Sequence, residues 1–326
     1  MTEPEPTTQE PTSDVSPDEP APQVSPVDSL AAELKQGTIR EFTASDGYTF
    51  RFRHYASSLK IPRGYVVALH GIQSHSGWYG YSSRRLSQAG FDVRFPDRRG
   101  SGLNETDRGH APHEERLIND VAHFLADVRH ERNRTAPTQP VILMGVSWGG
   151  KLAAMVAALR PELVDVLALL YPGICPRIRP TVIQRGLLRL AELAGVDRKT
   201  APIPLSDPAL FTSDPDWQQF LRDDERTLHE ATTGFFIANR NLDRAVHNYA
   251  EWIHCPLLLM LAGQDRIINN QETKQFYERL GSTTRQLLEY PEAAHTLEFE
   301  PNREEIVSDL INWLDDQCGA RLSSHT

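Results

Sequence analysis

The pattern of hydrophobic and polar positions predicts strands and helices in alternation. Short continuous apolar runs at Tyr65–Leu69, Phe91–Phe95 and Val141–Val146 are typical of strands that are covered on both faces. Between the second and third runs, Glu114–Arg134 places its apolar side chains on one face of a helix. Such alternation favours right-handed crossovers and a parallel sheet. The expected fold class is therefore α/β.

The remaining elements continue this order. Residues on either side of Ser45-Asp46-Gly47 partly alternate between apolar and polar, which predicts a hairpin over Thr38–Thr43 and Tyr48–Tyr55. The other expected strands and helices, in chain order, are Tyr79–Ala89, Val164–Leu170, Pro256–Leu261, Asn270–Leu280, Arg285–Tyr290 and Glu304–Leu314. Together they predict a mostly parallel central sheet flanked by helices.

The alternation breaks at about residues 175–252. This stretch is rich in Arg, Pro and Asp, is helical in places and shows no clear strand, so an inserted helical segment is the simplest account. Within it, Thr181–Ala194 has apolar residues at near-helical spacing, a pattern that can contact acyl chains or a lipid surface. We expect this stripe to pack onto the body of the protein instead. Further candidates for lining an apolar pocket are Phe235, Phe236, Ile237 and Trp252.

The amino-terminal stretch differs in composition from the rest. Residues 1–28 carry seven acidic side chains and no Lys or Arg, and residues 1–27 contain seven of the 23 prolines. So few apolar residues cannot offset the entropy of ordering the chain. We therefore expect a disordered acidic, Pro-rich tail over residues 1–29 and one domain over residues 30–326. The net charge of −10 argues against nucleic acid as the main partner, and the charge of about −3 without the tail indicates no charged ligand.

Composition narrows the class of protein further. The content of 39% apolar and 24% charged residues is that of a soluble globular chain. The three cysteines are widely spaced and form no metal, redox or disulfide pattern. No secretory signal and no apolar run of membrane-spanning length is visible. We expect a cytoplasmic protein that needs no metal or organic cofactor, and the sequence leaves its oligomeric state open.

A Gly-x-Ser-x-Gly motif connects one of the predicted strands to an Ala-rich helix. The strand Val141–Val146 runs into Gly145-Val146-Ser147-Trp148-Gly149, and the helical stretch begins at Lys151. A chain of this length would contain the motif by chance about one time in ten, so its context carries the argument. A sharp strand–turn–helix connection holds a serine above the sheet in a strained conformation. We therefore expect Ser147 to be a nucleophile.

A serine nucleophile needs a base and a third group that orients the base. In an open parallel sheet these partners should lie on loops at the carboxyl ends of later strands. Asp265 follows the strand Pro256–Leu261, and His295 follows Arg285–Tyr290. Simpler alternatives are a small residue in a tight turn for Ser147, an N-cap of the following segment for Asp265, and a packed or solvated loop residue for His295.

Acyl transfer also needs two backbone N–H groups for the developing oxyanion. One should belong to Trp148, the residue after the nucleophile. The other should come from the loop Leu69-His70-Gly71-Ile72-Gln73, where Ile72 is our candidate. The alternative for this loop is a simple turn that ends a strand.

These motifs, in order, resemble one branch of the α/β-hydrolases. His70-Gly71-Ile72-Gln73-Ser74-His75-Ser76-Gly77-Trp78-Tyr79 resembles the His-Gly-x-Gly-Glu-His-Ser-x-Arg-Tyr stretch of the monoacylglycerol lipase and lysophospholipase branch, which is of the serine aminopeptidase S33 type. Asp97-Arg98-Arg99-Gly100-Ser101-Gly102 is similar to that branch's Asp-x-x-Gly-x-Gly turn. The resemblance implies an α/β-hydrolase fold with an inserted helical cap. It also implies the triad Ser147, Asp265 and His295, with Ile72 and Trp148 as oxyanion donors.

The chain departs from that pattern at three positions. Gln73 and Ser74 replace Gly-Glu, and Trp78 replaces Arg, which alters the wall of the site near the oxyanion loop. His75 keeps its place, and we interpret it as a structural residue of the loop.

The expected activity is hydrolysis of carboxylic esters of small molecules or lipids, such as acylglycerols or lysophospholipids. Contact with a membrane is expected to be at most peripheral, through the cap. Three alternatives stay open: an amidase or peptidase, a thioesterase, and a non-catalytic scaffold with this fold.

Overall fold

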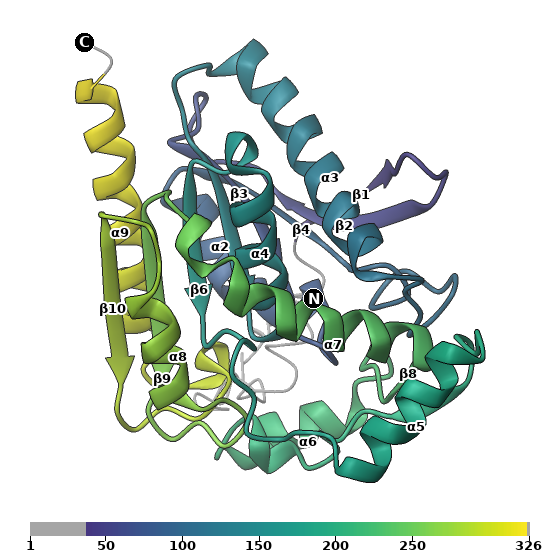
Figure 1. The fold of residues 1–326 in the computed structure, drawn as a ribbon. Coiled ribbons are helices and arrows are strands. Elements are labelled where there is room, and N and C mark those ends of the chain that lie inside the picture. The colour runs from purple at the N-terminus through teal and green to yellow at the C-terminus, as the bar shows by residue number, and fades with distance from the viewer. Residues whose placement is uncertain (1–36, 325–326) are drawn as a thin grey trace, which may run out of the picture.

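A computed structural model describes residues 37–324 (Figure 1). Within this range eight strands form one sheet in the order β1-β2-β4-β3-β5-β6-β9-β10. β2 pairs antiparallel with β1 and β4, and the pairs from β4 to β10 are parallel. The strands are β1 (Thr38–Thr43), β2 (Thr49–Tyr55), β3 (Gly64–Leu69), β4 (Phe91–Pro96), β5 (Val141–Val146), β6 (Val166–Leu170), β9 (Leu257–Ala262) and β10 (Arg285–Tyr290). The α/β-hydrolase fold expected from the sequence is confirmed.

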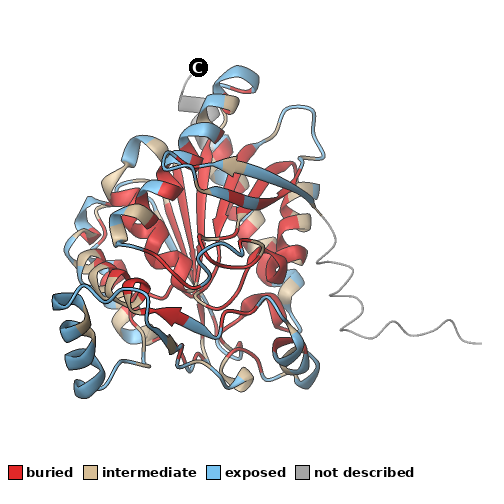
Figure 2. Cartoon of the chain, turned by 90° about the vertical axis from the view of Figure 1, so that its right-hand side faces the viewer, coloured by how far each residue is buried: buried red, intermediate tan, exposed pale blue. Residues whose placement is uncertain are grey.

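Helices cover both faces of the sheet. The helices around the sheet are α2 (Gly80–Gln88), α3 (Glu114–Thr135), α4 (Trp148–Leu159), α8 (Asn270–Glu278) and α9 (Arg303–Ser324). Successive residues of the central strands belong to opposite apolar cores: Val67 and Leu143 pack with α3 and α4, whereas Val66 and Ile142 pack with α2 and α9. Because β3 and β5 are buried on both faces, their sequences are continuous apolar runs. Figure 2 shows these central strands as the most buried part of the molecule.

The residues between β6 and β9 form a largely helical segment, here called the inserted segment (residues 175–252). It contains α5 (Val182–Leu193), α6 (Pro215–Asp223) and α7 (Thr233–Asn248). The expectation that it holds no strand was wrong, since β7 (Thr200–Pro202) and β8 (Glu230–Thr232) form an antiparallel pair. Strands of three residues are too short to show an alternating pattern in the sequence.

α5 is more exposed than we expected. Our prediction that its apolar stripe packs onto the body was wrong, because no residue of α5 is buried. Its apolar side chains Val182, Ile183, Leu187, Leu190 and Leu193 are between 60% and 78% exposed. The helix contacts α7 (Figure 1), and Glu192 forms an ion pair with Arg240 of that helix. Its apolar face is therefore left open.

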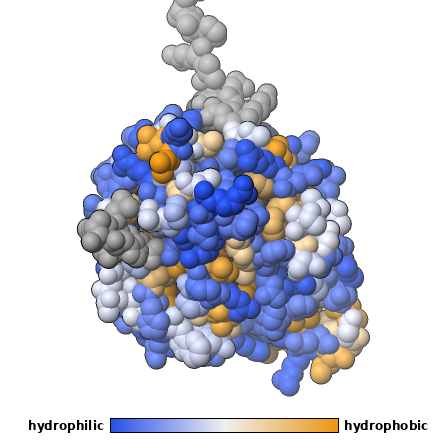
Figure 3. All heavy atoms as spheres, turned by 90° about the horizontal axis from the view of Figure 1, so that it is seen from above, coloured by the Kyte–Doolittle hydropathy of each residue, from blue (hydrophilic) through white to orange (hydrophobic). Residues whose placement is uncertain are grey.

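The four other apolar candidates of the inserted segment differ in burial. Phe235 is buried, Phe236 and Ile237 are half-buried, and Trp252 is 58% exposed. The end of the molecule that faces away from the inserted segment, where the parallel strands begin, has a mainly hydrophilic surface (Figure 3). No helix within residues 37–324 is long and apolar enough to cross a bilayer. The predicted tail, residues 1–29, lies outside the described residues.

Candidate active site

The loop between β5 and α4 forms the sharp turn that the motif predicts. Ser147 separates the two elements and has a φ of 50°, a left-handed conformation that non-glycine residues seldom adopt. A Cβ atom on Gly149 would lie 2.3 Å from the Leu69 carbonyl oxygen, and one on Gly145 would lie 2.6 Å from Gly150 Cα. Glycine is therefore required on both sides of Ser147 for strand and helix to approach each other.

Ser147, His295 and Asp265 form a continuous chain of hydrogen bonds. His295 Nε2 is 2.9 Å from Ser147 Oγ, and His295 Nδ1 is 2.7 Å from Asp265 Oδ2. Asp265 Oδ1 accepts the backbone N–H groups of Ile267 and Ile268, each at 2.8 Å. An ionised carboxylate only accepts, so His295 Nδ1 carries the proton and Nε2 is free to accept the serine hydroxyl.

The simpler alternatives for the two partner residues account for only part of their contacts. Asp265 does accept N–H groups of the segment that follows it, but Asn269 caps α8, and the second carboxylate oxygen of Asp265 binds His295. His295 is buried, and both of its ring nitrogens are hydrogen-bonded, so it is not a solvated loop residue. The ring edges of Tyr171 and Phe211 lie against it, with centroids 4.9 and 5.9 Å away. These contacts hold the imidazole in one orientation.

The two predicted oxyanion donors flank the serine. A Cβ atom on Gly71 would be 3.4 Å from Ser147 Cβ, so the loop that carries Ile72 passes beside the nucleophile. Trp148 is the first residue of α4, where backbone N–H groups have no acceptor within the helix. The helix N-terminus also favours negative charge. This placement supports both assignments.

The loop after Ile72 is fastened to the inserted segment by a carboxylate that the sequence reasoning missed. Asp224 Oδ2 accepts from His75 Nε2 at 2.9 Å, from Trp78 Nε1 at 2.7 Å and from Thr227 Oγ1 at 2.9 Å. Burial by itself raises the pKa of Asp224, but the hydrogen bonds from His75 and Trp78 outweigh it and lower the pKa well below its usual value.

His75 and Trp78 therefore have structural roles. His75 Nδ1 accepts the Gly77 N–H at 3.0 Å, so the proton on Nε2 is the one given to Asp224. Trp78 is buried and holds the loop through its indole N–H. Trp78 stands where the family motif has Arg, and this difference was the sequence signal for the contact. Nothing in the sequence around Asp224 indicated its role.

A second polar cluster joins α4 to α7. Asn239 Oδ1 accepts from Trp148 Nε1 at 2.8 Å and from Lys151 Nζ at 2.9 Å. Lys151 is buried and also forms an ion pair with Asp243. The inserted segment is thus bonded to the helix that follows Ser147.

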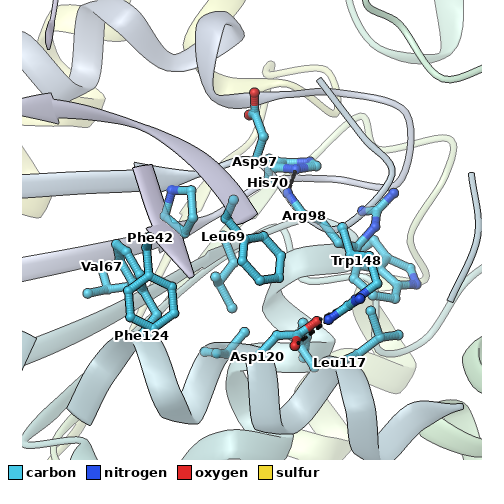
Figure 4. Close-up of a pocket in the computed structure, with 15 residues that line it drawn as sticks. Phe42, Val67, Leu69, His70, Asp97, Arg98, Leu117, Asp120, Phe124 and Trp148 are labelled. Atoms are coloured by element: carbon cyan, nitrogen blue, oxygen red, sulfur yellow. Dashed lines mark hydrogen bonds and ion pairs between the residues drawn. The ribbon is translucent and has the colours of Figure 1, made fainter. Parts of the chain in front are cut away.

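A small cavity lies behind the oxyanion loop, away from His295 and Asp265. Its volume is about 40 Å³ and its lining is mainly apolar, from Phe42, Leu69, Phe124 and other side chains (Figure 4). Pockets for small-molecule ligands usually measure hundreds of Å³, so this cavity is too small to hold an acyl chain. No group of three or more His, Cys, Asp or Glu side chains in residues 37–324 is arranged to hold a metal.

Comparison with known proteins places this geometry in a family. The sequence profile of the family described as serine aminopeptidase, S33, matches residues 60–302. The chain is 26% identical to a monoacylglycerol lipase of Mycolicibacterium smegmatis over 257 residues, which are 78% of this chain and 88% of that protein. It is 26% identical to an uncharacterized abhydrolase domain-containing protein of Dictyostelium discoideum over 86% of this chain, but spans only 29% of that protein.

Solved structures agree on the fold. A soluble variant of monoglyceride lipase from Saccharomyces cerevisiae, in complex with a substrate analog, matches with a TM-score of 0.75 at 20% identity. The match covers 87% of this chain and 95% of that one. Since the family profile covers well over half of the chain, the resemblance seen in the motifs is confirmed. The chain belongs to the serine aminopeptidase S33 family of α/β-hydrolases, among relatives that include monoacylglycerol lipases.

Proposed function

We propose that this carboxylic ester hydrolase cleaves lipid esters through an acyl-enzyme on Ser147. The observation that carries the proposal is the hydrogen-bond chain from Ser147 Oγ through His295 to Asp265, with the base and the carboxylate both buried. The similarity to the monoacylglycerol lipase of Mycolicibacterium smegmatis supports an ester as the substrate.

The reaction has two halves. Ser147 Oγ attacks the ester carbonyl as its proton passes to His295 Nε2, and Asp265 stabilises the imidazolium. His295 returns this proton to the departing alcohol, which leaves the acyl group on Ser147. A water molecule then gives a proton to His295 and attacks the acyl group, and the acid leaves as His295 reprotonates Ser147. The amides of Ile72 and Trp148 stabilise both oxyanions, and loss of one such donor costs about 3 kcal/mol.

The inserted segment is proposed as a cap over Ser147. Its Phe211 packs on His295 and accepts the Thr296 N–H at 2.8 Å, and the Leu228 N–H donates to Gln73 of the oxyanion loop at 2.9 Å. The open apolar face of α5 supports acylglycerol- or lysophospholipid-like substrates, because such a face can contact the lipid surface in which they reside.

Amide hydrolysis is the second candidate function. The observation that favours it is the description of the matching family as serine aminopeptidase. The same triad can cleave an amide or a thioester, so the triad geometry alone does not distinguish ester, amide and thioester hydrolysis.

A substrate panel tests the proposal. The panel contains p-nitrophenyl esters from acetate to palmitate, a 1-monoacylglycerol, a lysophosphatidylcholine and aminoacyl amides, with Ser147→Ala as the blank. We expect hydrolysis of a lipid ester with kcat/KM well above that for any amide. Faster cleavage of aminoacyl amides than of every ester would instead establish the amidase.

A further inference from the structure

We propose that Arg98 is a positioning residue for the oxyanion hole, because its guanidinium contacts both parts of the chain that supply the oxyanion N–H groups. It donates to the carbonyl oxygen of the Gly71–Ile72 peptide and lies against the ring of Trp148. This inference rests on the ester hydrolysis proposed above. The motif that contains Arg98 was noticed in the sequence only as a turn.

The first step of the argument is the peptide that carries the Ile72 N–H. Its carbonyl oxygen, Gly71 O, accepts from His70 Nδ1 at 2.8 Å and from Arg98 Nη1 at 3.3 Å. The next carbonyl, Ile72 O, accepts from Arg98 Nη2 at 2.9 Å. In a trans peptide the C=O and N–H groups point in opposite directions. Donors at the carbonyl end therefore fix the direction of the Ile72 N–H.

His70 has a single proton arrangement that suits this task. The Arg98 backbone N–H donates to His70 Nε2 at 2.8 Å, so the ring proton resides on Nδ1 and is donated to Gly71 O. Burial, and then the charge of Arg98, lowers the pKa of His70 to about 3. The ring is consequently neutral at pH 7, and backbone and side chain of Arg98 act on the same peptide.

The guanidinium lies against two neighbouring aromatic rings, whose centres are 5.4 Å apart. Its Cζ is 4.7 Å from the Trp148 ring centre and 5.0 Å from that of Phe235 on α7, and Figure 4 shows Arg98 between His70 and Trp148. Such contacts stabilise a cation and restrict its position. Arg98 therefore lies where the oxyanion loop, the start of α4 and the inserted segment meet.

Within residues 37–324, no carboxylate lies within salt-bridge distance of the Arg98 guanidinium, although the charge of the neighbouring Asp97 acts on it. Burial lowers the pKa of Arg98 to about 9, so the group is still protonated at pH 7. A cation bound to the carbonyl end of a peptide polarises it and strengthens its N–H as a donor. The effect is largest when negative charge develops on the substrate.

Arg98→Met tests the proposal, with Arg108→Met as the matched control. Arg108 also donates to backbone carbonyls, Arg226 O at 2.8 Å and Gly102 O at 3.4 Å, but it is exposed and does not contact the oxyanion loop. We expect Arg98→Met to lower kcat for p-nitrophenyl butyrate about 10- to 100-fold with KM within about threefold of wild type. Arg108→Met should keep the wild-type kcat.

Two further measurements separate positioning from a general structural defect. The affinity for a trifluoromethyl ketone, which forms an oxyanion on Ser147, should fall in proportion to kcat/KM in Arg98→Met. Arg98→Lys keeps the charge without the fork of donors and should recover part of kcat. If Arg98→Met does not fold, the test uses Arg98→Lys instead. A kcat of Arg98→Lys equal to that of wild type, with equal affinity for the ketone, would then overturn the proposal.

The proposal is overturned if Arg98→Met matches Arg108→Met in kcat, or if kcat falls while affinity for the ketone is unchanged. Either result leaves the proposed function intact as long as the wild type hydrolyses esters. A wild type without ester hydrolysis overturns the proposed function itself, so the two failures are distinguishable.

Discussion

Two of the buried His–carboxylate pairs in the described residues differ in what the second ring nitrogen of the histidine contacts. In the pair of His295 and Asp265, the second ring nitrogen faces Ser147 Oγ, so the histidine can accept a proton. In the pair of His75 and Asp224, the second ring nitrogen accepts a backbone N–H and is unavailable to a substrate. The partner of the second ring nitrogen is the basis for the role that we propose for each histidine: general base for His295 and structural contact for His75.

Asp224→Asn should destabilise the protein by about 2–3 kcal/mol, because the buried donors of His75, Trp78 and Thr227 lose a charged acceptor. The native pKa of Asp224 is lowered relative to the unfolded chain. Its contribution is therefore complete above the unfolded-state pKa of about 3.9 and is lost as the pH falls through the native pKa. Urea unfolding of wild type and variant should show a constant difference from pH 5 to 8 and a smaller one below about pH 4.

The neighbouring Asp223 provides the control. It is exposed and bonds to the side chain of Gln219, so Asp223→Asn should change stability by less than about 0.5 kcal/mol. A difference between Asp224→Asn and wild type that widens in acid would contradict the assigned role.

At this scale, the sequence revealed the residues that directly follow predicted strands. Ser147 follows a strand inside a short motif, and Asp265 and His295 each follow a strand end, so topology alone predicts their meeting. Arg98 and Asp224 could not be assigned in this way. Asp224 acts on a histidine 149 positions earlier, and no pattern along the chain records that contact.

Among the elements, α5 shows what amphipathicity can and cannot predict. The periodic apolar residues correctly indicated a helix, and Thr181 with Gln184 forms the capping box that starts it. The pattern does not say what covers the apolar face. A packed face and an open one have the same sequence, because only the neighbouring elements differ.

If α5 contacts a lipid surface, its apolar face should matter for aggregated substrates only. The double variant Leu187→Ser and Leu190→Ser should keep its stability within about 0.5 kcal/mol, because both side chains are exposed. It should hydrolyse p-nitrophenyl acetate at the wild-type rate but a monoacylglycerol in vesicles severalfold more slowly.

Ile61→Ser is the matched control, since Ile61 is 60% exposed like Leu187 but lies outside the inserted segment. It should leave both rates unchanged. Equal rates on vesicles for all three proteins would show that α5 is not the contact surface.

The whole molecule brings these parts together at the carboxyl edge of one sheet. The strands of the core were predicted to within about two residues because burial on both faces makes them continuously apolar. β7 and β8 were missed because three residues carry no period. The inserted segment is held to the body by Asp224, Asn239 and backbone bonds, whereas α5 at its edge has no buried residue.

The central claim is that Ser147 is the nucleophile of this molecule. Reaction with a fluorophosphonate, followed by intact mass and peptide mapping, tests it most directly, because the probe needs an activated serine and an oxyanion hole but no particular substrate. Wild type should gain one adduct on Ser147, and Ser147→Ala should gain none. A folded wild type that stays unlabelled, or an adduct that persists in Ser147→Ala, would contradict the account.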